Sequence, residues 1–590
     1  MPPKRSSGSP TKRPSKRIRS AYGTLGAATA ADDTARLIAS HHLAEHAGGG
    51  ATYLATRDDK AVVRALRDVS LEVAARGIFE SIRFLEKEGP VTQNMTGKVA
   101  GPSRSAVGWD VNRTSNGRTT SLAVDTIAIG DFVQQLEEET ANRLLANVLF
   151  LSYQALQVAN DPGVSVIAIA SIFFRDRISR LSLSSLHPPT ILLNKIPQCS
   201  ALTDLNLSHS ESLRDNVLAK VLAQLTHLDK VNLKACTKVG DASIEALAMA
   251  ASSTLRTANL SFTAVGMKGL SALIGKCAYL EVLKLQAVGN LHERAINQVV
   301  EIATRTSTRT LPLANLRTLK LRQTLVTDAA LGRLLTLCSP TLTRLDVSYT
   351  MLKSLDIVSS ALHTLPAWQL EKLVASGLPL TPASLDGFFR PLAERPEPER
   401  RKFKVLKLGS IPSISTKAPG LTDAVVNKLM PSLERLEGLE SVSLFGNVFL
   451  GKTREPMTSV IGFLGSRCTS LDLTALPLES RHLDGLLPEF STGDSELGED
   501  GAPRLPNPPR LETLVLDSTK ITDEAADAIG HCRHLKALHV AETKISPRFL
   551  ATVLTSCPDM SILNLTSCRG IAVTQRRNFF EAWDKGEVEL

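Results

Sequence analysis

The sequence predicts an α/β solenoid, an array of strand–turn–helix repeats, preceded by a helical N-terminal region. The first observation is a phrase with apolar residues at positions 1, 4 and 6, L-x-x-L-x-L, which begins fourteen times between residues 178 and 560 at intervals of 24 to 43 residues. The second is the helical apolar spacing after the phrase, as in "LAKVLAQL" at 218–225 and "LGRLLTLC" at 331–338. A period near 26 residues carrying both patterns indicates stacked units, because no single unit can bury its apolar face alone.

The first 20 residues are strongly basic and contain no acidic residue. Their charged side chains are Lys4, Arg5, Lys12, Arg13, Lys16, Arg17 and Arg19. Since these supply +7 of the net +9, the other 570 residues carry only +2. A segment this polar is expected to be disordered. Its two basic clusters are similar to a nuclear import signal and predict a location in the nucleus, or in nucleus and cytoplasm. The alternative is non-specific contact with nucleic acid, through this tail only.

Residues 21–177 are predicted to form a helical N-terminal region with a polar linker near 89–120. The helical spacing includes Val69, Val73, Ile78 and Ile82, which we expect to lie on one buried face. The array is then expected to fill residues 178–590, with a disordered acidic loop near 491–510. The apolar runs are shorter than the roughly 20 residues that a membrane helix requires, so no membrane contact is expected.

All eight cysteines lie in the array and recur at fixed positions of the repeat. Cys199, Cys277, Cys532 and Cys557 stand three residues before a strand phrase, and Cys236 stands three residues after one. One cysteine per unit at the same phase favours reduced, buried thiols over disulfides. Turn phrases V-T-D, L-T-D and I-T-D at 326–328, 421–423 and 521–523 predict that Thr or Asp caps the following helix.

Together, C-x-x-L-x-x-L-x-L and the T-D turn resemble the cysteine-containing class of leucine-rich repeats, which is ribonuclease-inhibitor-like and typical of F-box/LRR and antagonist-of-mitotic-exit-type proteins. The resemblance covers residues 178–572 and implies a horseshoe. It also implies a non-catalytic protein-interaction scaffold or substrate receptor, the recognition subunit of a ubiquitin-ligase complex with a ligase adaptor as partner. An F-box would occupy 121–177, which lacks the usual Leu-Pro start and the late Trp. A degenerate F-box and a plain helical cap therefore both remain open, as does a GTPase-regulating leucine-rich-repeat protein.

The free face of the strands supplies the candidate binding residues. Basic side chains gather in the middle of the array, at Lys284, Arg317, Lys320, Arg322, Arg344 and Lys407. We expect them to hold an acidic or phosphorylated segment of another protein, although a merely solvated sheet face fits the same residues.

No pattern in the chain indicates catalysis or a cofactor. Neither a P-loop nor a G-x-S-x-G elbow occurs. His531, Cys532 and His534 lie close together, but Cys532 occupies the structural position of the repeat, so no metal is predicted.

Overall fold

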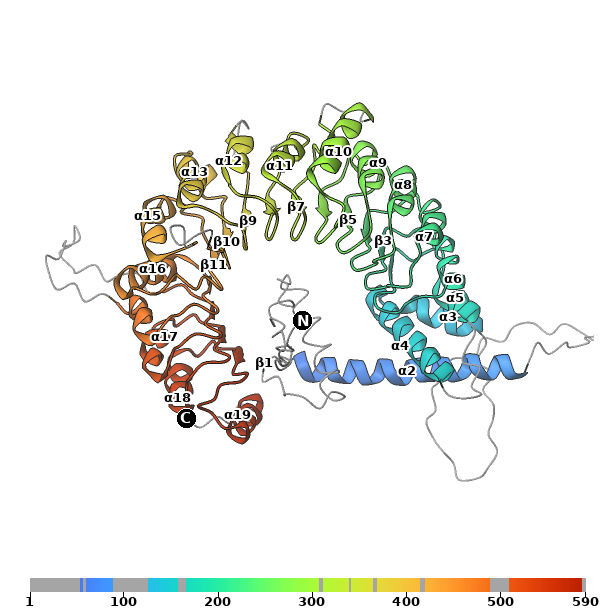
Figure 1. Cartoon of the computed structure of the whole chain (residues 1–590). Helices are drawn as coiled ribbons and strands as arrows, with labels where there is room; N and C mark the ends of the chain where they lie inside the picture. Colours follow the sequence, from blue (N-terminus) through green and yellow to red (C-terminus); the bar gives the residue numbers. More distant parts are fainter. Residues whose placement is uncertain are drawn as a thin grey trace, which may run out of the picture. The chain divides into compact units, whose positions relative to one another are not determined.

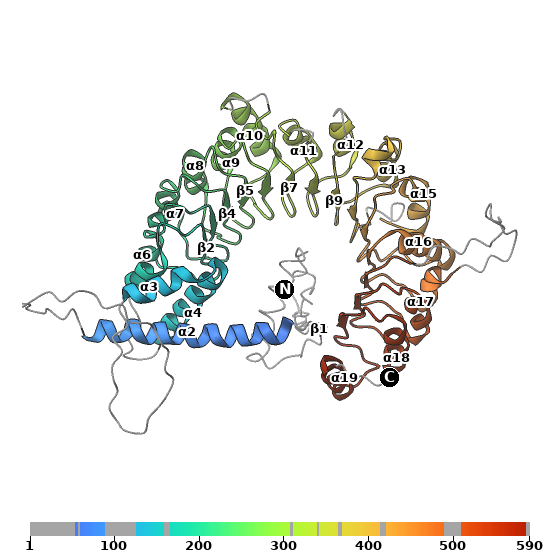
Figure 2. The ribbon, with the colours of Figure 1, turned by 180° about the vertical axis from the view of Figure 1, so that it is seen from behind.

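The computed structural model describes residues 54–56, 60–88, 126–157, 166–306, 311–338, 341–363, 369–413, 420–488 and 509–585. The basic tail at 1–20, the linker at 89–120 and most of the loop at 491–510 lie outside these residues. Fourteen parallel strands form one open, curled sheet, in sequence order from β2 to β15. The strands line the inner side of the curled array, and the helices lie along its outer side (Figures 1 and 2). The predicted leucine-rich-repeat solenoid with a helical N-terminal region is confirmed.

Each strand holds three residues, at positions 3 to 5 of the L-x-x-L-x-L phrase. The strands are β2 (Arg180–Ser182), β3 (Asp204–Asn206), β4 (Lys230–Asn232), β5 (Thr257–Asn259), β6 (Val282–Lys284), β7 (Thr318–Lys320), β8 (Arg344–Asp346), β9 (Lys372–Val374), β10 (Val405–Lys407), β11 (Ser441–Ser443), β12 (Ser470–Asp472), β13 (Thr513–Val515), β14 (Ala537–His539) and β15 (Ile562–Asn564). A further strand, β1 (Leu54–Thr56), pairs antiparallel with β15.

Helices connect the strands on the outer side. They are α6 (Thr190–Leu193), η2 (Ile196–Gln198), α7 (Asp215–Leu222), α8 (Asp241–Ala250), α9 (Met267–Lys276), α10 (Glu293–Thr306), α11 (Asp328–Leu335), α12 (Asp356–His363), α13 (Pro382–Ala393), α14 (Glu397–Arg400), α15 (Asp423–Glu434), α16 (Arg454–Arg467), η3 (Ser480–Leu486), η4 (Asp523–Ala525), α17 (Ala526–Gly530), α18 (Pro547–Ser556) and α19 (Val573–Lys585). Among the described residues, no helix is both long and apolar enough to cross a membrane.

The middle residue of every strand points into the core, between the sheet and the helices. It is Leu in most coils, and in all fourteen it is at most 3% exposed. Neighbouring strands pair these residues directly, for example Leu319 with Leu345. A slip of one residue would move every leucine to the free face, so burial fixes the register.

Each coil turns at the same point, two residues after its last apolar strand position. The residue there has a positive φ in every coil, as at Ala235 (60°) and Glu542 (58°). Its amide donates to the next coil, as from Ala235 N to the Ser261 carbonyl at 2.8 Å. A left-handed conformation costs a residue other than glycine about 1 kcal/mol, and this hydrogen bond between coils offsets that cost.

The eight cysteines are free and buried, as predicted. Cys236 Sγ donates to the Leu207 carbonyl of the preceding coil at 3.1 Å, and Cys568 Sγ does the same to Val540. Burial raises the pKa of the Cys338 thiol to about 12. These thiols therefore act as small core side chains and not as nucleophiles.

The T-D turns link neighbouring coils, and those at 326–328 and 421–423 also cap their own helices, whereas Thr522 of the turn at 521–523 makes no side-chain cap. Thr327 and Thr422 accept hydrogen bonds from the amides of Ala330 and Val425, as N-caps do. The following aspartate instead reaches the next coil. Asp423 accepts from the amides of Gly451, Lys452 and Thr453, at 2.5, 3.0 and 2.8 Å.

The same contact recurs at Asp215 in an earlier coil, where Gly240, Ala242 and Ser243 donate their amides. Burial, the largest single effect, acts to raise the pKa of Asp215, but the hydrogen bonds from Ser243, Gly240 and Ala242 together lower it. The aspartate is therefore held as a carboxylate that joins two coils.

The N-terminal region contributes α2 (Lys60–Glu88), α3 (Thr126–Gln135), α4 (Glu138–Gln157) and α5 (Val166–Phe173). The expected face of α2 is partly wrong, because Val69 and Val73 are 60% and 67% exposed. Its buried side chains are Leu71, Ala75, Ile78, Phe79 and Ile82. Each of these has another member of the set three or four residues away, so they share one face, whereas Val73 and Ile78 are five apart and fall on different faces.

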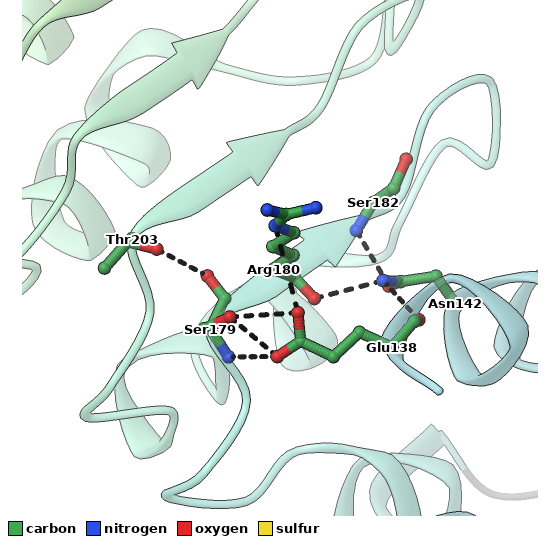
Figure 3. A network of polar contacts seen from close by, with 6 residues as sticks. All are labelled: Glu138, Asn142, Ser179, Arg180, Ser182 and Thr203. Carbon is green, nitrogen blue, oxygen red and sulfur yellow. Dashed lines mark hydrogen bonds and ion pairs between the residues drawn. The ribbon is translucent and has the colours of Figure 1, made fainter. Parts of the chain in front are cut away.

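Helix α4 covers the free edge of β2 (Figure 3). The Asn142 side chain accepts from the Ser182 amide and donates to the Arg180 carbonyl, both at 3.0 Å, as a neighbouring strand would. Glu138 accepts from the amide and hydroxyl of Ser179 at 3.0 and 2.7 Å. The N-terminal helices therefore cap the array, which satisfies a sheet edge that would otherwise stay unpaired.

We expect Asp423→Ala to lower the free energy of unfolding by about 3 kcal/mol, because three amides, one buried and two half-buried, lose their acceptor. Thr422→Ala, which removes only the local cap, should cost about 1 kcal/mol. Chemical denaturation of both variants checks the difference. Equal losses would show that the aspartate does not join the coils.

Candidate functional site

The free face of the sheet is built from the first and third residues of each strand, because the middle residue is buried. At β2 to β5 this face carries Arg180, Asp204 and Lys230, and the charges of the two cations act on Asp204. The polar residues beside them are hydrogen-bonded to one another. Asn206 Nδ2 donates to Ser182 Oγ at 3.2 Å, and Ser184 and Ser208 share a hydrogen bond of 2.8 Å. The first coils therefore offer little net charge to a partner.

The residues just before the strands form a column of alternating charge. Arg256 pairs with Glu281 at 2.7 Å and with Asp229 at 3.5 Å. Farther along, Lys404 pairs with Glu440 at 2.8 Å and Lys536 with Glu512 at 3.0 Å. Because neighbouring coils neutralise each other here, this ion-pair column adds little net field.

The central strands carry a basic cluster, which consists of Lys320, Arg344, Lys372 and Lys407. Arg344 and Lys372 lie opposite each other on β8 and β9. Burial lowers the pKa of Lys372, and the charges of Lys407, Lys320 and Arg344 lower it further, while Asp346 acts in the opposite direction. The cations of four coils therefore repel one another around the half-buried side-chain amine of Lys372.

Three of the predicted residues, Lys320, Arg344 and Lys407, belong to this cluster. Lys284 lies on β6 opposite Lys320. Arg322 follows β7 and stacks over the Tyr349 ring at 5.1 Å. Arg317 instead precedes β7, at the position of the ion-pair column, and is exposed.

Sequence reasoning missed Lys372, although a signal was present. Lys372 stands at the same repeat position as Arg344, one coil later. The position between the fourth and sixth apolar sites, which holds Lys284, Lys320 and Lys407 in other coils, is Val374 on this strand.

Two aromatic rings lie beside the basic cluster, over glycines. A Cβ on Gly377 would come within 2.3 Å of the Tyr349 ring, and one on Gly409 within 2.1 Å of the Phe445 ring. Only glycine allows this approach. The aromatic rings therefore lie directly on the glycine backbone, and the surface next to the lysines is partly apolar.

A second cluster, which is acidic, follows on the next strands. It consists of Asp472 at the end of β12, Asp517 after β13 and Glu542 after β14. Burial raises the pKa of Asp517 to about 6, and the charges of Asp472 and Glu542 add to the rise, while the Ala541 amide opposes it with a hydrogen bond of 2.6 Å. Sequence analysis did not identify this acidic cluster.

The described part of the chain contains no group of three or more His, Cys, Asp or Glu side chains placed to hold a metal ion. Cys532 is buried in the core, and His531 hydrogen-bonds through Nδ1 to the Asp527 carbonyl at 2.8 Å. The chemistry available on the free face is thus ionic and hydrogen-bonding recognition.

No protein-family model matches the sequence. No curated protein matches it either. Among solved structures, the chain is similar to the Rad7 and Elc1 complex of yeast, with TM-score 0.42 and 15% identity over 76% of this chain and 89% of that one.

It is also similar to an internalin, inlF, of Listeria monocytogenes, with TM-score 0.36 and 15% identity over 70% and 93% of the two chains. A third similar structure is a TLR13–ssRNA13 complex, with TM-score 0.32 and 16% identity over 59% and 43%. The fold assignment rests on the strand pairing of this chain itself.

We predict that Asp517→Asn stabilises the protein at pH 8 and has little effect at pH 4. A raised pKa means that the folded state gains stability when Asp517 is protonated. That gain is complete below the unfolded value of 3.8 and is lost as pH rises through about 6. The difference at pH 8 should be about 3 kcal/mol. Denaturation between pH 4 and 8 measures it, with the exposed Asp559→Asn as control. A pH-independent effect would contradict the assignment.

Proposed function

We propose that this protein is a non-catalytic binding scaffold that holds an acidic or phosphorylated segment of a partner protein on the free face of its sheet. The observation that carries the proposal is the convergence of Lys320, Arg344 and Lys407 on Lys372. Like charges held together raise the energy of the free protein, and an anionic ligand removes that repulsion.

The surroundings of the basic cluster support a protein partner. The Tyr349 ring, 36% exposed, and Phe445 offer apolar contact beside the charges. Arginine and aromatic side chains are the residues that dominate binding energy at protein interfaces. A carboxylate or phosphate on an extended segment could pair with the cations while neighbouring side chains pack on the rings.

A finer proposal is that the scaffold belongs to the cysteine-containing repeat class and serves as the substrate receptor of a ubiquitin ligase. The buried cysteines that recur before and after the strand phrase support the class. The helical cap supports the receptor role through Phe150 on α4, which is 56% exposed. A large apolar side chain on a surface helix is suited to burial against a ligase adaptor.

Reversing charge in the basic cluster tests the first proposal. We expect Lys372→Glu/Lys407→Glu to weaken binding of a fluorescent hexaglutamate peptide by more than about tenfold, because two cations become repulsive. The control Lys404→Glu/Lys536→Glu makes the same change of net charge in the ion-pair column. Fluorescence anisotropy should show only a small effect there. Equal losses in both variants would mean that net charge, and not this cluster, binds the peptide.

The receptor proposal is tested with a purified ligase adaptor that recognises F-boxes. The intact chain should bind the adaptor, and Phe150→Asp should abolish binding because a charge replaces the apolar contact. The control is Met249→Asp on α8, since Met249 is 67% exposed and lies in the array. If the intact chain does not bind, or if Phe150→Asp binds equally well, the helical unit is a cap only.

A further inference from the structure

We propose that the partner segment is bipolar, with an acidic stretch over the basic cluster and, on the same segment, a basic stretch over the acidic cluster. This inference rests on the proposed function and adds the charge order of the ligand. It assigns Asp472, Asp517 and Glu542 to the binding surface alongside the four cations.

The two clusters occupy one continuous face. The basic cluster comes from β7 to β10 and the acidic cluster from the coils of β12 to β14, in a sheet whose strands follow one another without a break. Only β11 lies between them, and the residues on either side of its middle Val442 are uncharged: Ser441 is half-buried and Ser443 is buried. Ser443 Oγ donates to Asp472 Oδ2 at 2.7 Å, so it leans toward the acidic side.

The described residues offset the charge of each cluster only in part. In the basic cluster Asp346, which lies opposite Lys320 on the neighbouring strand, acts against the cations at Lys372. On the other side, Asp472 accepts from the hydroxyls of Ser443 and Thr474. Asp517 accepts from an amide, and Glu542 accepts from the Ser518 hydroxyl at 2.8 Å. The ion-pair column shows that neighbouring coils of this chain can pair their charges, which makes the two unpaired clusters distinctive.

The separation of the clusters sets the spacing on the ligand. From β9, which carries Lys372, to β13, which precedes Asp517, there are four strand steps. At about 4.8 Å a step the charge centres lie about 19 Å apart. An extended peptide covers that distance with about six residues.

Charge complementarity selects this ligand over simpler ones. A uniformly acidic segment long enough to cross β11 would meet repulsion from the acidic cluster. A uniformly basic one would meet repulsion from Lys372 and its neighbours. Only a segment with both charges satisfies both clusters, and it can lie along the array in one charge orientation.

The test compares labelled peptides on the full chain at low salt. In EEE-GSG-KKK the charge centres are six residues apart. In EEE-GSG-GSG the basic end is removed, and EKE-GSG-KEK has the first composition without separated charges. We expect EEE-GSG-KKK to bind about tenfold more tightly than either of the others.

Two double variants show which carboxylates produce the tighter binding of EEE-GSG-KKK. In Asp472→Asn/Glu542→Gln the ratio of affinities between EEE-GSG-KKK and EEE-GSG-GSG should fall to near one. In the control Asp229→Asn/Glu281→Gln, which removes two carboxylates from the ion-pair column, the tenfold ratio should persist. Thermal unfolding of each variant confirms that it is folded.

The outcomes separate the two proposals. If EEE-GSG-GSG binds and the lysines add nothing, or if the ratio survives in Asp472→Asn/Glu542→Gln, the bipolar inference is overturned and the basic binding surface stands. If no peptide with glutamates binds, the proposed function fails together with it.

Discussion

The structure depends on the pairing of a three-residue strand with its neighbour, around one buried side chain per coil. Leu319 against Leu345 is typical, and a one-residue slip would expose the whole apolar set. The same register determines which side chains are neighbours on the free face of the sheet. Lys320 and Lys407 are far apart in the sequence, yet both act on Lys372 because their strands are stacked in order. Core packing and the candidate binding surface are thus two results of one register.

The charged side chains of the array are of two kinds, those that a neighbouring coil neutralises and those that lie near like charges. Before the strands, Arg256 and its acidic neighbours neutralise each other, and the aspartates of the T-D turns, such as Asp423, bind amides of the next coil. On the free face, Lys372 on β9 and Asp517 after β13 are desolvated and lie near like charges, so the folded chain is less stable than it could be. Local departures from good electrostatics are typical of functional surfaces. This contrast is the reason for assigning function to the middle of the free face.

The sequence was sufficient for features that depend on a repeat. The fourteen strand phrases, the helices after them and the buried cysteines follow from spacing alone, and the structure confirms them. Features that depend on which coils are neighbours were harder. Thr422 caps its own helix as expected, but Asp423 after it binds the next coil. Asp517 did not stand out in the sequence, because its raised pKa depends on burial and on the neighbouring Asp472 and Glu542. The exposed Val69 and Val73 show that an approximate apolar spacing does not decide which face of a long helix is buried.

The central claim is that the basic cluster is a binding surface whose repulsion a ligand relieves. The pH dependence of acylation at individual lysines, followed by mass spectrometry, reports it directly. The account predicts that the pKa of Lys372 is below its ordinary value of 10.5 in the free protein and rises when hexaglutamate is added. The acylation profile of the exposed Lys520 should not respond to the peptide. A Lys372 profile that is unchanged by the peptide, or one that changes equally at Lys520, would contradict the account.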